Sequence, residues 1–215
     1  MDENIEITRD TYNAIAHCFD FLLTPENAAN GEIQFLDNFL SKIKKGGRIV
    51  DLGCGVGKHS RYCLKKGFRV VGYDISDAMI KNAKDHDPSE HTELLFFKIS
   101  DMCDFESDLI FDGAIIAFSM MHLTIVQAKK MLENLKKYLS DGAIILIATL
   151  QGSGEGYKRE MLADDHQIFI KEYMQEEMLD LLDSAGYVHI DFSSGKDEDP
   201  KAICEDVLFI TAHRR

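Results

Sequence analysis

Short apolar runs alternate with segments of helical periodicity over most of the chain. The apolar runs are nearly continuous, rich in β-branched residues and flanked by turn residues, which is typical of strands buried on both faces of a parallel sheet. They cover residues 48–53, 69–74, 92–99, 111–118 and 142–150. Helical periodicity falls between them, at residues 58–66, 76–86 and 124–139, and the last begins with a possible capping box of Thr124 and Gln127. This alternation predicts right-handed βαβ units and a doubly wound α/β sheet.

Two amphipathic helices are expected ahead of this alternation. In residues 8–23 apolar side chains recur at helical spacing, and Thr8 is a suitable N-cap. The same period returns in residues 33–43, and we expect the pair Gly46-Gly47 to end that helix.

The end of the chain has a different pattern. After a helical segment at residues 174–185, two apolar strands follow at residues 187–194 and 202–214, separated by only seven residues. A connection this short cannot hold a crossover helix, so the two strands should form an antiparallel hairpin. The predicted fold is therefore α/β: a doubly wound, seven-stranded, mostly parallel sheet with an antiparallel C-terminal strand, in three αβα layers.

The composition adds limits to this picture. With 215 residues the chain fits one compact domain, in which N-terminal helices (residues 1–45) precede a core domain (residues 46–215). The formal net charge of −13 disfavours a nucleic-acid partner, because affinity for a phosphate backbone comes largely from Lys and Arg. No apolar stretch approaches the ~18 residues that a membrane span needs.

The cysteines and the N-terminus bear on location. The 5 cysteines are scattered and include no CxxC pair, which argues against a disulfide framework and a structural zinc site. The N-terminal sequence MDENIEITRD is acidic and polar, unlike a secretory signal. We expect a cytoplasmic protein with no metal.

A glycine-rich loop carries the first chemical signal. The sequence IVDLGCGVGKHS places Asp51 at the end of the first core strand and glycines at positions 53, 55 and 57. Glycine allows left-handed backbone conformations and close approach of a ligand. A nicotinamide fingerprint would need a third glycine where Lys58 stands, and the phosphate-binding P-loop spacing is also absent. The loop therefore favours a ligand without a pyrophosphate.

An acidic residue follows the second strand. Asp74 lies 21 residues after Gly53, where a carboxylate can accept hydrogen bonds from both ribose hydroxyls. Together with the glycine loop, it indicates a nucleoside-type ligand in the crevice beyond the strands' carboxyl ends.

These residues carry a family resemblance. The run IVDLGCGVGKHSRYCLKKGFRVVGYDISDAMI resembles the first two motifs of class I S-adenosylmethionine-dependent methyltransferases, and the likeness extends over residues 45–213. The helix sequence YNAIAHCFD ahead of the core is similar to that of the small-molecule branch. The resemblance implies S-adenosylmethionine as cofactor and S-adenosylhomocysteine as product, with the N-terminal helices forming a lid over the ligand site.

The resemblance also implies which residues bind the cofactor. Asp51 would lie near the methionine ammonium group, Asp74 would bind the ribose, and Tyr12 would close over the ligand. Asp101 would reach the adenine amino group, with Met102 packed on the ring. The remaining implied cofactor contacts are Gly53, Cys54, Gly55, Gly57, Ile75, Phe118 and Ser119.

Each of these positions also has a purely structural reading. Asp51 and the glycines could serve only a tight turn, and Asp74 could cap the next helix, although Ser76 already suits that role. Asp104 is a second acid near Asp101, and Tyr12 fits an apolar helical stripe.

The catalytic demands on the protein are small, because a methyl sulfonium is already an activated electrophile. The sequence AFSMMHLT lacks the [DN]-P-P-[YF] motif of amide and exocyclic-amine methyltransferases, which makes nucleobase and glutamine amide acceptors unlikely. His122, in the loop after the fourth strand, is a candidate general base because its ordinary pKa is near 6.5. The alternative is a histidine that only anchors this loop. Tyr12 is a second catalytic candidate.

Residues 150–173 are expected to form a long, mobile loop that covers the site as a lid. Similar enzymes build their acceptor contacts in this region. The candidates that would face the acceptor are Tyr157, Lys158, Arg159, His166, Phe169 and Tyr173.

The sequence thus predicts a methyltransferase that moves a methyl group from S-adenosylmethionine to an oxygen, nitrogen or other nucleophilic atom of a small molecule. A monomer or homodimer is expected. Two alternatives stay open: a catalytically inactive S-adenosylmethionine-binding scaffold or sensor, and an NAD-dependent oxidoreductase, which the glycine spacing opposes.

Overall fold

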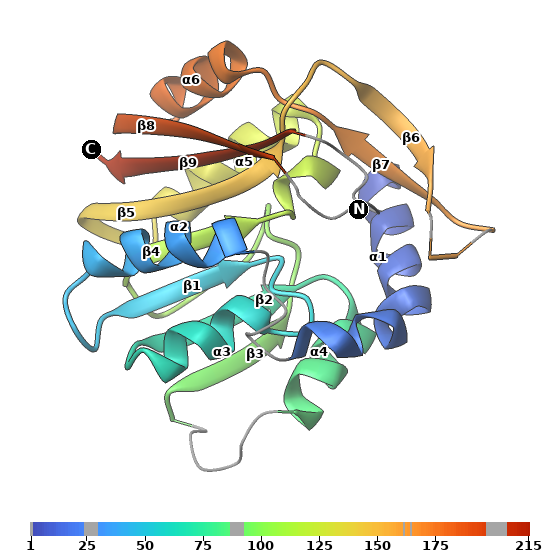
Figure 1. The fold of residues 1–215 in the computed structure, drawn as a ribbon, viewed down its shortest axis with the longest axis horizontal. Helices are drawn as coiled ribbons and strands as arrows, with labels where there is room; N and C mark the ends of the chain where they lie inside the picture. The colour runs from blue at the N-terminus through green and yellow to red at the C-terminus, as the bar shows by residue number, and fades with distance from the viewer. Residues whose placement is uncertain (1, 24–29, 87–92, 161, 164, 197–205) are drawn as a thin grey trace.

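A seven-stranded sheet with strand order β3-β2-β1-β4-β5-β9-β8 forms the centre of the molecule (Figure 1). The computed structural model describes residues 2–23, 30–86, 93–160, 162–163, 165–196 and 206–215. A second sheet pairs β6 with β7. The strands are β1 Arg48–Leu52, β2 Arg69–Asp74, β3 Leu95–Ile99, β4 Phe111–Ala117, β5 Leu139–Leu150, β6 Glu155–Arg159, β7 Gln167–Lys171, β8 Tyr187–Lys196 and β9 Asp206–Arg214.

The sheet topology confirms the predicted fold. Strands β1 to β5 pair in parallel, and β9 lies antiparallel between β5 and β8. The predicted C-terminal hairpin is therefore present, and its second strand is the one that joins the parallel part of the sheet. The predicted segment 202–205 lies outside the described residues.

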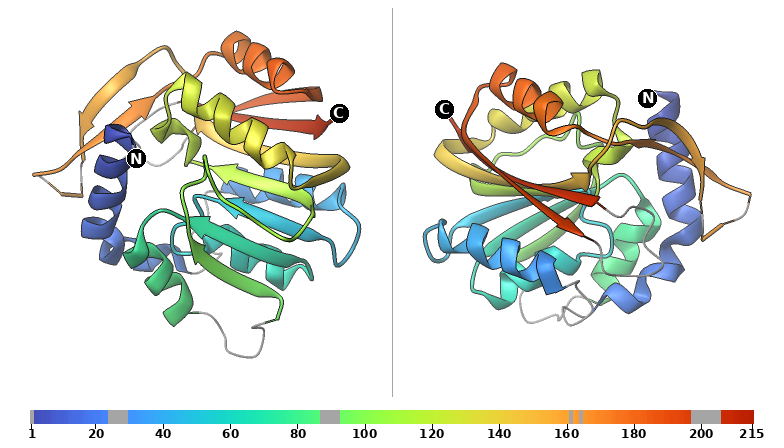
Figure 2. Two further views of the ribbon diagram at one scale, coloured as in Figure 1. Left: turned by 180° about the vertical axis from the view of Figure 1, so that it is seen from behind. Right: turned by 45° about the horizontal axis from the view of Figure 1, so that its top comes forward.

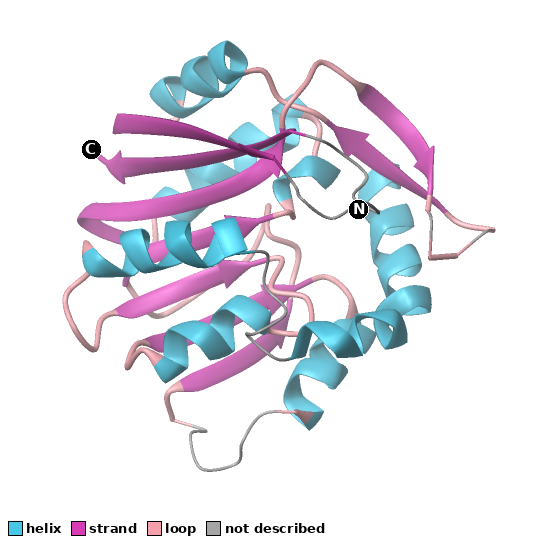
Figure 3. Ribbon diagram, viewed as in Figure 1, coloured by secondary structure: helices cyan, strands magenta, loops and turns pink. Residues whose placement is uncertain are grey.

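Helices cover both faces of the sheet (Figure 3). Helices α2, α3 and α4 pack on one face around Phe39, Ile49 and Ile115, whereas α5 and α6 pack on the other around Val50 and Leu132. Neighbours Ile49 and Val50 serve opposite faces because side chains alternate along a strand. The bounds are α1 Glu3–Ile15, α2 Asn30–Ser41, α3 Lys58–Lys65, α4 Asp77–Asp85, α5 Ile125–Lys136 and α6 Gln175–Ser184, with 3₁₀ helices η1 Ala16–Leu23 and η4 Met120–His122.

The N-terminal helix begins earlier than predicted. Helix α1 starts at Glu3, so Thr8 lies inside it and is not its N-cap. The Thr8 hydroxyl donates to the carbonyl of Asn4 (2.7 Å), the bond that a threonine in a helix interior typically makes. The predicted α-helix over 8–23 also changes character at Ala16, where the 3₁₀ helix η1 begins.

Helix α2 differs from prediction in its end and its role. It ends at Ser41, because Lys42 and Ile43 donate to carbonyls three residues back and so close the helix with a tighter turn before Gly46. Its apolar side lies in the core against the sheet. The expectation that all N-terminal helices form a lid is therefore wrong for α2, while α1 lies beyond the carboxyl ends of the parallel strands (Figure 2).

Residues 150–173 are not the long loop that the sequence suggested. Strands β6 and β7 form an antiparallel pair within them, with Tyr157 opposite Phe169. Strand β7 lies beside α1, and β6 pairs with β7 on the side away from α1 (Figure 1). In contrast, the capping box at the start of α5 is confirmed, because the Thr124 and Gln127 side chains each bond the other's backbone N–H.

Within the described ranges, no helix combines the length and apolar character needed to span a bilayer. In the same ranges no three His, Cys, Asp or Glu side chains are grouped as a metal ion would require. The four described cysteines, Cys18, Cys54, Cys63 and Cys103, are free.

Candidate active site

The glycine loop follows β1 at the carboxyl edge of the sheet, and its Gly53 N–H donates to the Tyr73 carbonyl at the end of β2 (2.7 Å). Gly53, Gly55 and Gly57 all have left-handed backbone conformations, with φ of 72°, 52° and 80°. A Cβ on Gly53 would lie 2.2 Å from Cβ of Ser119, and a Cβ on Gly57 would lie 2.5 Å from the Phe97 ring. Gly53 and Gly57 are thus required by packing. A Cβ on Gly55 would meet nothing within 4 Å, so Gly55 is the position that leaves room for a ligand.

Asp51 is buried beneath this loop. It is 1% exposed, and its Oδ2 accepts a hydrogen bond from the Ser60 hydroxyl (2.6 Å) at the start of α3. Burial raises the pKa of Asp51, and the charge of His59 and the Ser60 hydrogen bond partly oppose that rise. The Asp51 carboxyl group therefore ties β1 to α3 below the loop.

Asp74 connects the end of β2 to the glycine loop. Its Oδ2 accepts the Gly55 N–H and its Oδ1 accepts the Ser76 N–H, each at 2.8 Å. Burial raises the pKa of Asp74 to about 6 in spite of these bonds. Ser76 is the N-cap of α4 through the Met79 N–H (3.1 Å), so α4 does not need Asp74 as a cap. A carboxylate oxygen has two lone pairs, and each oxygen can still accept a ligand hydroxyl.

The predicted adenine and loop residues make mostly local contacts. Asp101 accepts the Cys103 N–H (2.8 Å), whereas Met102 reaches the glycine loop beside Gly53. The Cys54 side chain packs in the core against Gly72. Only the backbone of Cys54 therefore remains to contact a ligand at the glycine loop. Ile75 packs partly against the main core.

The end of β4 is strained. Phe118 has a φ of 54°, a left-handed conformation that costs a residue with a Cβ roughly 1–2 kcal/mol. Its ring packs with Ala148 and Phe209. The next residue, Ser119, donates its hydroxyl hydrogen to the Leu52 carbonyl (2.7 Å), which joins the ends of β4 and β1. Strain at this edge is typical of functional sites.

A hydrogen-bonded chain joins Tyr12, His122 and β7. The Tyr12 hydroxyl lies 2.8 Å from His122 Nε2, and His122 Nδ1 lies 2.9 Å from the Phe169 carbonyl. Since a carbonyl only accepts, Nδ1 carries the proton and Nε2 accepts from the tyrosine. Burial lowers the pKa of His122 to about 4, although the Phe169 carbonyl opposes this. The lowered pKa and the two hydrogen bonds favour the alternative of a histidine that anchors the loop after the fourth strand.

The acceptor-facing residues predicted in the hairpin divide between its two faces. Ile168 and Ile170 lie on the face that packs with Tyr12. Tyr157 lies on the opposite face, where its ring contacts Phe169 at 5.7 Å between centroids. Alternation places Arg159 on the Tyr157 face and Lys158 and His166 on the Tyr12 face.

Two of the residues predicted to face the acceptor, Lys158 and Tyr173, bond instead to other groups of the protein. Lys158 forms an ion pair with Glu172 (2.8 Å). Tyr173 is fully buried in the main core, and its hydroxyl donates to the carbonyls of Met120 and Leu123 (3.4 and 3.2 Å). Tyr173 therefore fixes η4 and does not face an acceptor, contrary to the prediction.

Two acids at this edge escaped the sequence analysis. Glu160, next to the hairpin turn, is 8% exposed, and its charge acts on Tyr12. Glu32 bonds Lys58 (2.6 Å) and His59 at the start of α3. Burial alone would raise the pKa of Glu32, but bonds and charges from His59 and Lys58 outweigh it and lower the pKa to about 2. Recognising the hairpin would have placed Glu160 by alternation, whereas no local signal links Glu32 to α3.

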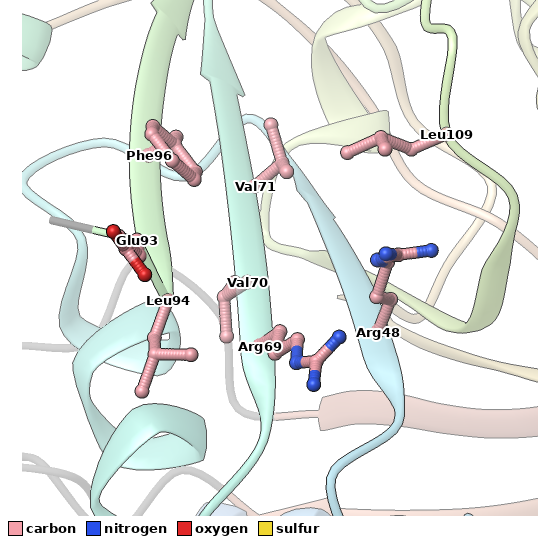
Figure 4. Close-up of a pocket in the computed structure, with 8 residues that line it drawn as sticks. All are labelled: Arg48, Arg69, Val70, Val71, Glu93, Leu94, Phe96 and Leu109. Carbon is pink, nitrogen blue, oxygen red and sulfur yellow. The ribbon is translucent and has the colours of Figure 1, made fainter. Parts of the chain in front are cut away.

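A hollow of about 350 Å³ lies elsewhere, at the amino-terminal ends of β1, β2 and β3 (Figure 4). Arg48, Arg69, Phe96 and Leu109 are among its lining residues. It shares no residue with the carboxyl edge described above, and ligands of doubly wound sheets bind at the carboxyl edge. We therefore place the candidate site at the glycine loop.

Comparison with known proteins identifies the family and the fold of this chain. The sequence profile of the methyltransferase domain family matches residues 26–192. An uncharacterized methyltransferase of Alkaliphilus oremlandii is 30% identical over 122 residues, which cover 55% of this chain and 53% of the relative. An O-methyltransferase of Aspergillus nomiae is 27% identical over 160 residues, covering 71% and 69%. The chain thus aligns with about half the length of the first of these curated relatives.

A solved structure shows the same fold. The 1,6-didemethyltoxoflavin-N1-methyltransferase of Burkholderia thailandensis, with bound 1,6-didemethyltoxoflavin and S-adenosylhomocysteine, superposes with a TM-score of 0.76 at 18% identity. The superposition covers 100% of this chain and 91% of that one.

Proposed function

This chain belongs to the methyltransferase domain family, and we propose that it transfers a methyl group from S-adenosylmethionine to a nucleophilic atom of a small molecule, releasing S-adenosylhomocysteine. The observation that carries the proposal is the bond between the Asp74 carboxylate and the Gly55 N–H (2.8 Å). It fixes an acid and an open glycine side by side at the carboxyl edge, where a ribose needs both a hydroxyl acceptor and close backbone approach.

The other cofactor contacts are proposed around this pair. Asp51 supplies negative charge for the methionine ammonium group, and Asp101 and Met102 form the adenine end. Phe118 and Ser119 stand beside the reacting sulfonium, at the end of β4. Tyr12 closes the site from α1, which with η1 is the proposed lid.

Methyl transfer requires the protein to position the acceptor more than to move a proton. S-adenosylmethionine, when bound, supplies the activated methyl group. The protein then has to hold the acceptor in line with the breaking bond and exclude water. The Tyr12–His122–Phe169 chain suits this task, because it joins α1, η4 and β7 at one point above the strand ends.

The finer attributes are part of the same proposal. The acceptor is a small molecule and not a nucleic acid, which the net charge of −13 supports. Free thiols at the four described cysteines support a cytoplasmic location. A monomer or homodimer is proposed.

The test is turnover. Purified protein incubated with S-adenosylmethionine and a panel of small acceptors should produce S-adenosylhomocysteine in an acceptor-dependent reaction. Binding of the cofactor without turnover on any acceptor would favour a scaffold or sensor. Binding of NADH but not S-adenosylmethionine would favour an oxidoreductase and overturn the proposal.

A further inference from the structure

Glu160 places a carboxylate on the face of the β6–β7 hairpin that packs against Tyr12. It directly follows β6, and its N–H donates to the His166 carbonyl (2.9 Å), so strand pairing continues one residue beyond β6. Side chains alternate across a strand, which puts Glu160 on the same face as Ile168 and Ile170. Because those two pack with Tyr12, this face is directed at the candidate active site.

This carboxylate is buried and forms no ion pair within the part of the chain that the structure describes. Only 8% of Glu160 is exposed, and its Oε1 accepts the Leu162 N–H (3.0 Å). Among the residues that the structure describes, no Lys, Arg or His forms an ion pair with it. Lys158, on the same face, is paired with Glu172 (2.8 Å). Buried charges in proteins are normally paired, so a charge directed at a binding site is expected to meet its partner in the ligand.

A role as a turn cap does not account for Glu160. An exposed side chain could make the same bond to Leu162, and that bond uses only one of the two carboxylate oxygens. The charge of Glu160 also acts on the Tyr12 hydroxyl and, after burial, contributes to the raised pKa of Tyr12. This agrees with the hairpin geometry, which puts Glu160 on the face that packs with Tyr12.

We propose that Glu160 binds the methyl acceptor and that the acceptor is a small molecule carrying an amino group. This inference rests on the proposed methyltransferase function. An ammonium group would pair with the carboxylate through charge-assisted hydrogen bonds, which are short and strong in a site that excludes water. A carboxylate-bearing acceptor would instead meet like charge from Glu160 and Asp74.

The test compares matched ligands on matched variants. Binding of 2-phenylethylamine against 2-phenylethanol, and of glucosamine against glucose, is measured by calorimetry in the presence of S-adenosylhomocysteine. The variants are Glu160→Gln, which keeps an oxygen for the Leu162 N–H, and the control Glu172→Gln on the same hairpin face. At least one amine should bind the wild type about tenfold more tightly than its hydroxyl counterpart. Glu160→Gln should lose this preference, and Glu172→Gln should keep it.

The outcomes separate this inference from the function on which it rests. S-adenosylhomocysteine should bind wild type and Glu160→Gln with affinities within about twofold of each other. If the wild type binds S-adenosylhomocysteine but prefers no amine, or if Glu160→Gln retains the preference, the assignment of Glu160 is wrong. A wild type that does not bind S-adenosylhomocysteine contradicts the methyltransferase proposal itself.

Discussion

At the scale of single residues, some roles in the candidate site follow from the residue's position in the sequence, whereas others depend on side chains that are distant in the chain. Asp74 was identifiable from sequence because its position after the second strand places it at the ligand edge. The state of His122 was not, because its neutral tautomer depends on the carbonyl of Phe169 and the hydroxyl of Tyr12, which lie 47 and 110 residues away in the chain.

Asp74 should make cofactor affinity depend on pH. Ribose hydroxyls donate best to the ionised carboxylate, so affinity is present above the pKa of about 6 and is lost as the pH falls through it. Between about pH 7.5 and about pH 5, S-adenosylmethionine affinity should fall roughly tenfold by calorimetry. Asp74→Asn should bind more weakly at the upper pH and show a flatter profile. A wild-type affinity that is constant over this range would contradict an ionised Asp74 at the ribose.

Tyr12 should contribute to stability through His122. Tyr12→Phe removes the donor to Nε2 and leaves a buried nitrogen without a partner. The free energy of unfolding in urea should fall by about 1–3 kcal/mol. Tyr157→Phe is the matched control, because that tyrosine is 46% exposed and should change stability little. Equal effects of the two substitutions would argue against the Tyr12–His122 bond.

At the scale of elements, the glycine loop and the hairpin were predictable to different degrees. The loop has a local signature, whereas β6 is almost entirely exposed and has no alternating apolar pattern. The hairpin is instead held in place by α1 and η4. Thr11 donates to the Gln167 carbonyl (3.0 Å) and His122 donates to the Phe169 carbonyl, both along the edge of β7 that does not pair with β6. Because these contacts are long-range, the sequence pattern of residues 150–173 predicted a loop and did not show the hairpin or its two faces.

The loop offers a paired test of ligand approach. Gly55 and Gly142 both have left-handed φ angles, of 52° and 72°, and a Cβ on either would meet no atom within 4 Å. Substitution by alanine should therefore destabilise both variants similarly, by roughly 1–2 kcal/mol of backbone strain. Only Gly55→Ala should weaken S-adenosylmethionine binding in calorimetry. Equal cofactor affinity in the two variants would place the ligand away from Gly55.

At the scale of the whole molecule, strand and helix periodicity predicted the sheet and its antiparallel C-terminal strand, because burial on two faces leaves a pattern in the sequence. The same reasoning did not show that α2 packs in the core while α1 lies at the strand ends. Both helices are amphipathic, and periodicity says which side of a helix is buried but not against what.

Two buried groups, His122 and Asp74, should change the free energy of unfolding in opposite directions as the pH changes. The pKa of His122 falls from 6.5 to about 4 on folding, so its contribution is present above pH 6.5 and lost as the pH falls. The pKa of Asp74 rises from 3.8 to about 6, so its contribution is present at low pH and lost as the pH rises.

Urea unfolding across this range can separate the two groups. Relative to wild type, His122→Gln should gain stability as the pH falls from about 6.5 to about 4, and Asp74→Asn should gain as it rises from about 4 to about 6. Parallel profiles for both variants and wild type would contradict the burial of these groups.

The central claim is that the glycine loop and Asp74 together bind S-adenosylmethionine, and calorimetry on wild type and Asp74→Ala tests it most directly. The wild type should bind S-adenosylmethionine and S-adenosylhomocysteine, and Asp74→Ala should bind each on the order of tenfold or more weakly, because two hydroxyls lose a charged acceptor. A wild type that binds neither compound, or an Asp74→Ala variant that binds as tightly as wild type, would contradict the account.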